Sequence, residues 1–213
     1  MSPRPRKASD DEVFAAAARV MSRVGPAELT LAAIAAEAGL TAGALVQRFG
    51  SKLELLRTMS KGLAEYTGDM AAGIRAAAPS PLAAVVAHAR CVAALAATPA
   101  ALARNLAYLT LDLTDRQLYP SLLRQARATR AAYRGYLEEA LAAGELRPGT
   151  DVAALTRAVE TAVSGSLLTW ATYREGAAAD WIERDVRAVL APYLGGTPAG
   201  RARRPARRGR SRR

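Results

Sequence analysis

Two threonines and two cationic side chains lie between residues 30 and 55, in the stretch TLAAIAAEAGLTAGALVQRFGSKLEL. Thr30 and Thr41 each precede a short helical pattern, where a hydroxyl oxygen can cap backbone amides. Arg48 carries a guanidinium fork that reaches phosphate or guanine, and Lys52 stands at the start of a further helical pattern. The chemistry that these groups suit is hydrogen bonding to nucleic acid.

Two short helices joined by a tight turn are predicted to hold these groups. Gly39 can supply the left-handed backbone that ends the first helix, and Leu45 with Phe49 forms the apolar face of the second at i, i+4. Small residues at Ala35 and Gly39 let two helices cross closely, as a helix-turn-helix requires. The second helix of such a unit enters the DNA major groove, so the pattern indicates DNA binding.

The same stretch resembles the tetracycline-repressor (TetR) family of bacterial transcription regulators. The family pattern is a Thr cap followed by I-A-x-x-A-G-V-S-x-G-x-L-Y-x-H-F-x-S-K-E-x-L. Its counterparts here are Thr30, Ile34-Ala35, Ala38-Gly39-Leu40-Thr41, Gly43, Leu45, Phe49, Ser51-Lys52 and Leu55. The resemblance covers roughly residues 10–60. The family Tyr, His and Glu are replaced by Val46, Arg48 and Leu53.

The resemblance implies a set of DNA-contacting residues. They are Thr30, Thr41, Ala42, Gly43, Ala44, Val46, Gln47, Arg48 and Lys52. The two threonines and Lys52 would contact phosphate, whereas Ala42 and Ala44 would offer methyl groups to thymine. Gln47 would pair with adenine, and Arg48 with guanine or phosphate. Val46 cannot donate the hydrogen bond of the family Tyr. For each polar residue, a capping or solvent-exposed role is the alternative.

The resemblance also implies a homodimer on a near-palindromic operator, because a short reading helix needs a second half-site. The last two long helices would form the dimer interface, through Val159, Val163, Leu167, Trp181, Val186 and Leu190. Ordinary intrachain core is the alternative for these residues. A ligand cavity would be lined by Tyr66, Met70, His88, Cys91, Tyr108, Leu111, Tyr133, Tyr136 and Trp170. Few charges lie on the inner stripes of these helices, so we expect a small apolar or aromatic effector.

Composition predicts an all-α fold of about nine helices. Hydrophobic residues make up 51% of the chain and aromatic residues only 5%, and Ala, Leu, Arg and Glu dominate. We expect a basic flexible arm (1–8), a helix-turn-helix domain (9–55), an effector-binding and dimerisation domain (56–194) and a disordered Arg-rich tail (195–213). One continuous helix is expected to begin after Ser51 and to run towards Ile74, connecting the two domains.

The excess of positive charge lies at the two ends of the sequence. The eight Arg of residues 195–213, with Arg4, Arg6 and Lys7, equal the formal net charge of +11. The arm is expected to add minor-groove or phosphate contacts. An alternative follows from the same charge: an architectural protein that grips DNA through its Arg-rich tails without sequence preference.

An enzyme with a DNA-binding appendage is a third hypothesis, which the residue types disfavour. One His and one Cys leave no zinc cluster and no disulfide within the chain, and no phosphate-loop motif occurs. We therefore expect no catalytic residues, metal or cofactor. The N-terminus lacks an apolar segment, and no 18-residue apolar run is free of charge, so a cytoplasmic protein without membrane contact is predicted. The favoured function is a sequence-specific regulator, a repressor released from its operator by a ligand.

Overall fold

The computed structural model describes residues 8–195, apart from the side chains of residues 95 and 96. Within this range the fold is all-α, as predicted. The α-helices are α1 Asp10–Met21, α2 Leu31–Ala38, α3 Ala42–Phe49, α4 Lys52–Lys61, α5 Leu63–Ala77, α6 Pro81–Val92, α7 Pro99–Thr114, α8 Tyr119–Ala142, α9 Val152–Tyr173 and α10 Ala178–Leu190. Short 3₁₀ helices follow α6 (Ala93–Ala96) and α10 (Ala191–Tyr193).

The helix boundaries follow from local capping chemistry. The hydroxyls of Thr30, Thr41 and Ser51 each accept a hydrogen bond from the backbone amide three residues later. Gly39 ends α2 in the left-handed region at φ 68°, a conformation that a residue with a Cβ adopts only at a cost. These predicted start and stop signals are confirmed.

The single long helix expected from Ser51 to Ile74 is divided in the structure at Gly62. This glycine has φ −82° and ψ −5°, and its N–H bonds only to the carbonyl of Ser60. Glycine is a poor helix former, which accounts for an interruption at this position. Two helices, α4 and α5, therefore connect the N-terminal unit to the rest of the molecule.

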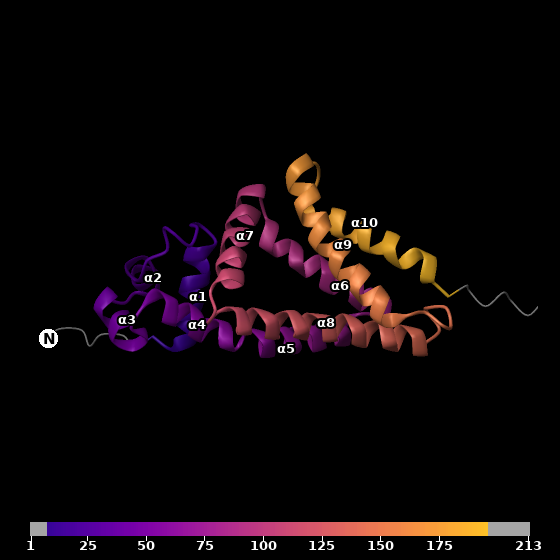
Figure 1. Cartoon of the computed structure of the whole chain (residues 1–213), viewed down its shortest axis with the longest axis horizontal. Coiled ribbons are helices and arrows are strands. Elements are labelled where there is room, and N and C mark those ends of the chain that lie inside the picture. Colours follow the sequence, from indigo (N-terminus) through magenta and orange to yellow (C-terminus); the bar gives the residue numbers. More distant parts are fainter. Residues whose placement is uncertain (1–7, 196–213) are drawn as a thin grey trace, which may run out of the picture.

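The molecule is elongated, with α1–α4 at one end and α9 and α10 towards the other (Figure 1). Helices α5 and α8 lie side by side along its length. Two apolar cores stabilise it. The N-terminal core includes Val13, Ile34, Leu45 and Leu55, and the larger one joins α5, α6, α8, α9 and α10.

None of the helices within residues 8–195 combines the length and apolar character that a membrane-spanning segment needs. The predicted tail (195–213), except Gly195, and the predicted arm (1–8), except Ala8, lie outside the described residues.

Candidate nucleic-acid interface

Helix α3 lies at the outer end of the molecule (Figure 1). Leu45 is fully buried and Phe49 is partly buried in the N-terminal core. All the α3 positions predicted to contact DNA are exposed: Ala42, Gly43, Ala44, Val46, Gln47 and Arg48. Val46 is 50% exposed despite its apolar side chain. The structure therefore leaves most of the surface of α3 open to a partner.

The two threonine caps mark helix ends that can receive an anion. The amide of Ala33 donates to Thr30 Oγ1 at 3.1 Å, and that of Ala44 donates to Thr41 Oγ1 at 3.2 Å. Both threonines are exposed. Capping is thus observed, and the positive ends of α2 and α3 remain open to solvent.

Gln47 is exposed on α3, and its side chain makes no hydrogen bond with any residue in the described range. Its amide can donate one hydrogen bond and accept another in the same plane, which is the pattern that adenine offers in the major groove. Ala42, Gly43 and Ala44 beside it are small, so that a base edge can come close to the helix backbone.

Arg48 is held by the chain itself. Its Nη1 donates to the backbone oxygen of Ala8 at 2.6 Å, and its guanidinium forms an ion pair with Asp10. The same group lies 5.4 Å from the centre of the Phe49 ring. Sequence reasoning left Arg48 available to guanine or phosphate; these partners, forty residues away in the sequence, were not foreseen.

Lys52 also has a partner within the chain. Its Nζ donates to the backbone oxygen of Pro26 at 2.9 Å, and its side chain is partly buried. This contact joins the start of α4 to the loop that follows α1. The ammonium has two further protons, which leaves it able to meet a phosphate as predicted.

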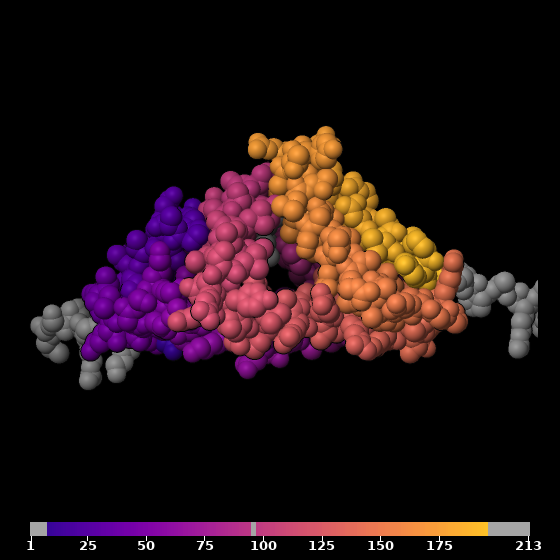
Figure 2. Space-filling model, in the orientation of Figure 1, coloured from indigo at the N-terminus to yellow at the C-terminus, as the bar shows by residue number. Residues whose placement is uncertain are grey.

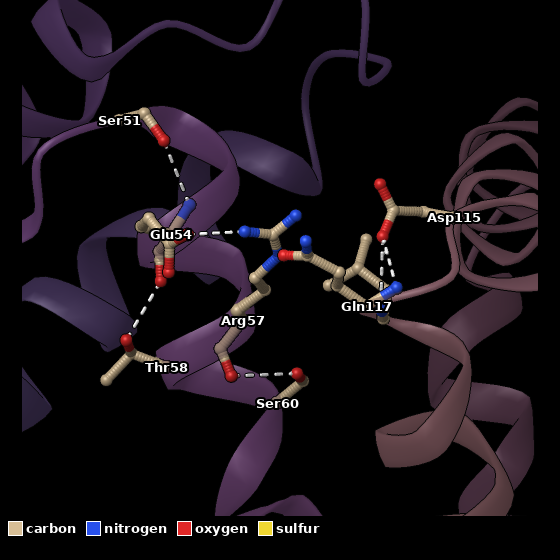
Figure 3. A network of polar contacts seen from close by, with 8 residues as sticks. Ser51, Glu54, Arg57, Thr58, Ser60, Asp115 and Gln117 are labelled. Atoms are coloured by element: carbon tan, nitrogen blue, oxygen red, sulfur yellow. Dashed lines mark hydrogen bonds and ion pairs between the residues drawn. The ribbon is translucent and has the colours of Figure 1, made fainter.

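A polar network on α4 faces the turn between α7 and α8 (Figure 3). Arg57 forms an ion pair with Glu54, whose amide donates to Ser51. From the turn, Gln117 is directed towards Arg57, and Asp115 accepts the Gln117 amide at 2.8 Å. Helix α4 thus contacts the larger part of the molecule beside the N-terminal unit formed by α1–α3, which is called the reading unit below.

Helix α7 contacts the N-terminal unit directly. Arg104 Nε donates to the backbone oxygen of Ser22 at 3.0 Å, and the Tyr108 hydroxyl donates to that of Val24 at 3.1 Å. Burial and, to a lesser degree, the charge of Glu28 raise the pKa of Tyr108 to about 12, so the hydroxyl stays protonated.

This contact corrects two residues of the predicted ligand pocket. Tyr108 is buried in the N-terminal core, and Leu111 packs against that core. Both therefore lie at the junction with the reading unit. The apolar pattern of α7 predicted an inner face but could not show which neighbour covers it.

Three other predicted pocket residues are brought together in the larger core. The rings of His88 and Tyr133 stack with centroids 4.7 Å apart, and Tyr136 meets His88 edge-on at 5.9 Å. The Tyr136 hydroxyl donates to the backbone oxygen of Ala71. In contrast, His88 Nδ1 and the Tyr133 hydroxyl are buried and have no hydrogen-bond partner among residues 8–195. Burial lowers the pKa of His88 and raises that of Tyr133, so both rings are neutral near pH 7.

The other four predicted pocket residues differ in their surroundings. Tyr66 is 64% exposed on α5, and Cys91 is exposed near the end of α6. Met70 is partly buried. Trp170 is buried in the same larger core, and its indole donates to the backbone oxygen of Gly176. Figure 2 shows an opening in the molecular surface between α7, α8 and α9. The structure thus brings together only part of the predicted set.

The predicted dimer-interface residues need correction as well. Five of the six are buried in the core of the chain itself: Val159, Val163, Leu167, Val186 and Leu190. Trp181 is partly buried, stacked on Tyr173 and on the guanidinium of Arg184. The apolar stripes of α9 and α10 therefore pack mainly against their own chain.

No group of three or more His, Cys, Asp or Glu side chains that could hold a metal ion occurs in the range 8–195.

Comparisons with known proteins relate this architecture to regulators. Residues 13–59 match the family described as bacterial regulatory proteins, tetR family. None of the curated proteins matches the sequence.

Several solved structures share the fold. A TetR transcription regulator from Haloarcula marismortui has a TM-score of 0.71 at 16% identity, covering 87% of this chain and 97% of that one. SmeT, the repressor of the Stenotrophomonas maltophilia multidrug efflux pump SmeDEF, has a TM-score of 0.63 at 20% identity, with 90% and 96% covered. A TetR transcriptional regulator from Streptomyces coelicolor has a TM-score of 0.62 at 24% identity, with 89% and 100% covered. The N-terminal unit therefore matches the tetR family of bacterial regulatory proteins, and the chain as a whole shares the fold of solved TetR regulators.

Proposed function

We propose that the protein is a homodimeric repressor that binds a near-palindromic operator through α3 and leaves it when a small ligand binds. The observation that carries the DNA contact is the exposure of α3. In α3 only Leu45 is completely buried, and Val46 is half exposed. The helix therefore presents a surface of mixed apolar and polar character to a partner. SmeT, a neighbour in fold, is a repressor, which favours repression here. Such a regulator would work in the cytoplasm, on the chromosome.

Base recognition would depend mainly on Gln47 and on methyl contacts from Ala42, Ala44 and Val46. The exposed starts of α2 and α3 at Thr30 and Thr41, together with Lys52, would hold phosphates. So few base contacts give limited discrimination for one protomer. Two copies on two half-sites would supply the remainder.

The dimer would form through the exposed faces of α9 and α10. On α9 these faces include Thr161, Ser164, Gly165 and Leu168, which recur at helical spacing. Leu168 is 51% exposed, and a Cβ added at Gly165 would meet nothing within 4 Å. A partner helix could therefore approach closely at Gly165 and cover Leu168.

An effector site is supported by the pair of His88 and Tyr133. Two buried polar atoms without partners are costly, by about 1–3 kcal/mol each. A small molecule that is largely apolar, with one hydrogen-bonding group, would satisfy them on entering this core. Because α7 also contacts Ser22 and Val24, a ligand that binds better to a conformer with α7 displaced would move the reading unit.

The test is selection of duplexes from a random pool by the purified full-length protein, followed by footprinting and repeated binding at increasing salt. A near-palindromic site that survives raised salt, and that persists after deletion of residues 195–213, is the expected result. The competing function, nonspecific coating of DNA, is favoured by the net charge of +11. Uniform enrichment of all sequences and loss of binding with the tail would replace our proposal by that one.

A further inference from the structure

The segment that joins α1 to α2 is bonded to α7 through two of its backbone carbonyls. Arg104 Nε donates to the carbonyl oxygen of Ser22 at 3.0 Å. The Tyr108 hydroxyl donates to that of Val24 at 3.1 Å, from a side chain that is only 7% exposed. Because a buried polar group that loses its partner is costly, these two bonds hold the segment against α7.

A third carbonyl of the same segment holds Lys52, at the start of α4. Its Nζ donates to the carbonyl oxygen of Pro26 at 2.9 Å, and its side chain is partly buried. The carbonyls of residues 22, 24 and 26 therefore each accept a hydrogen bond from a distant helix, two from α7 and one from α4. The segment thus lies between α7 and the cation that is proposed to meet a phosphate.

The segment between these contacts is compact. The amide of Val24 donates to the carbonyl of Val20 at 3.0 Å. The amides of Glu28 and Leu29 both donate to that of Gly25 at 3.1 Å. Leu29 is 1% exposed and belongs to the N-terminal core. A segment with internal hydrogen bonds and a buried end passes a shift at one carbonyl to the next, whereas a loosely bonded loop would absorb it.

We propose that Tyr108 and Arg104 are positioning residues for the DNA contact of Lys52, acting through the segment from Ser22 to Pro26. This inference rests on the proposed operator binding, in which Lys52 meets a phosphate. The Pro26 carbonyl accepts one of the three ammonium protons and thereby orients the other two. Tyr108 acts only indirectly, because it is buried in the N-terminal core and uncharged.

A flexible side chain gains most from such positioning. The ammonium of Lys52 is carried by a four-carbon stem, whose rotamer freedom is lost when it binds a phosphate. A lysine that is already held by a carbonyl loses less of this freedom on binding, so its contact is stronger. A displacement of α7 that breaks the bonds to Ser22 and Val24 would loosen Pro26 and lower operator affinity.

A double-mutant cycle on the duplex selected by the wild-type protein tests the proposal. The single variants are Tyr108→Phe, which removes one buried hydroxyl, and Lys52→Met, which removes the ammonium but keeps a long side chain. We expect Tyr108→Phe to weaken binding about five-fold in the wild-type chain and less than about two-fold in the Lys52→Met background. A merely structural defect would weaken binding equally in both.

The salt dependence of binding gives a second, independent measurement. Lys52→Met should lower the slope of log affinity against log salt by about 0.9 for each phosphate contact that is lost. Tyr108→Phe removes no charge, yet it should lower the slope as well, because the ammonium is no longer held towards its phosphate. Arg104→Met breaks the neighbouring contact at Ser22, and we expect its effect on affinity to depend on Lys52 in the same way.

Tyr119→Phe is the matched control for the loss of a tyrosine hydroxyl. Tyr119 lies at the start of α8, and its side chain is 44% exposed. The variant should keep the wild-type affinity and salt slope. Melting temperatures within a few degrees of the wild type establish that each variant is folded, and Arg104→Met replaces Tyr108→Phe in the cycle if the latter melts much earlier.

The outcomes separate this inference from the proposed function. Unchanged or tighter binding by Tyr108→Phe, or equal losses in the two backgrounds, overturns the positioning role and leaves operator binding in place. If Lys52→Met keeps the wild-type affinity and salt slope, the phosphate contact of Lys52 fails, and the positioning role fails with it. A wild-type chain that prefers no duplex overturns operator binding itself.

Discussion

At the scale of single residues, Gln47 is the polar group best placed to read a base. It is exposed on α3, and its neighbours Ala42 and Ala44 are too small to obstruct it. We predict that Gln47→Ala weakens operator binding by about 1–3 kcal/mol, because a bidentate contact to one base is lost. Fluorescence anisotropy with the selected duplex and an unrelated duplex measures this change.

Binding to the unrelated duplex is the control for the Gln47→Ala variant. Affinity for the unrelated duplex and the melting temperature should both stay at the wild-type values, since the exposed side chain makes no hydrogen bond within the described range. Equal losses on the two duplexes would show that Gln47 contributes no specificity.

His88, the single histidine of the sequence, predicts a pH dependence of stability. Burial lowers its pKa in the folded state below the ordinary value of 6.5, so the unfolded state binds more protons between these two values. The free energy of unfolding should therefore fall as the pH drops below about 6.5, with a slope of up to about 1.4 kcal/mol per pH unit, and level off below the folded pKa. Urea unfolding from pH 7.5 to 5 measures it.

Two substitutions isolate this effect. His88→Phe keeps an aromatic ring against Tyr133 and should flatten the pH dependence. Tyr133→Phe removes the unpaired hydroxyl but no group that titrates in this range, so the slope should persist. An unchanged slope in His88→Phe would assign the pH dependence to the carboxylates instead.

At the scale of elements, two glycines end helices for different reasons. Gly62 has helical dihedral angles and space for a Cβ, whereas Gly39 has φ +68°. We predict that Gly62→Ala stabilises the protein by about 0.5–1 kcal/mol, and that Gly39→Ala destabilises it by about 1–2 kcal/mol. Denaturant unfolding of the two variants provides the measurement.

Comparing the two variants would show whether the break between α4 and α5 at Gly62 acts as a hinge between the two parts of the molecule. If Gly62→Ala also weakens the response of operator binding to an effector, the interruption between α4 and α5 helps to couple effector binding to the N-terminal unit. A destabilising Gly62→Ala would mean that the backbone at this position is not helical in solution.

At the scale of the whole molecule, the proposed dimer makes the exposed face of α9 a contact surface. We predict that Leu168→Arg shifts the protein from dimer to monomer, because a charge would be buried against the partner. Leu113→Arg on α7 is the matched control, since Leu113 is 56% exposed and Leu168 is 51% exposed. Analytical ultracentrifugation distinguishes the species, and a dimer that persists in Leu168→Arg places the interface elsewhere.

Interactions within a few residues were predictable from the amino-acid sequence. The caps at Thr30, Thr41 and Ser51 and the helix end at Gly39 depend on hydrogen bonds and dihedral angles that one residue type favours. These signals fix the residues at which α2 and α3 begin and end. The helix boundaries in turn determine which α3 residues, Gln47 among them, lie on one face. The all-α class followed from the same local preferences.

Contacts between distant segments were decided by the tertiary structure. A helical stripe shows that one face is apolar but not which neighbour covers it, so Val163 and Val186 proved to be intrachain core and Tyr108 a part of the N-terminal core. Arg48 looked available because its partners, Ala8 and Asp10, lie far away along the chain. Local sequence patterns do not show which helix face is covered or which partner a side chain meets, because these depend on packing between distant segments. The contacts of Arg48 with Ala8 and Asp10 were determined by such packing.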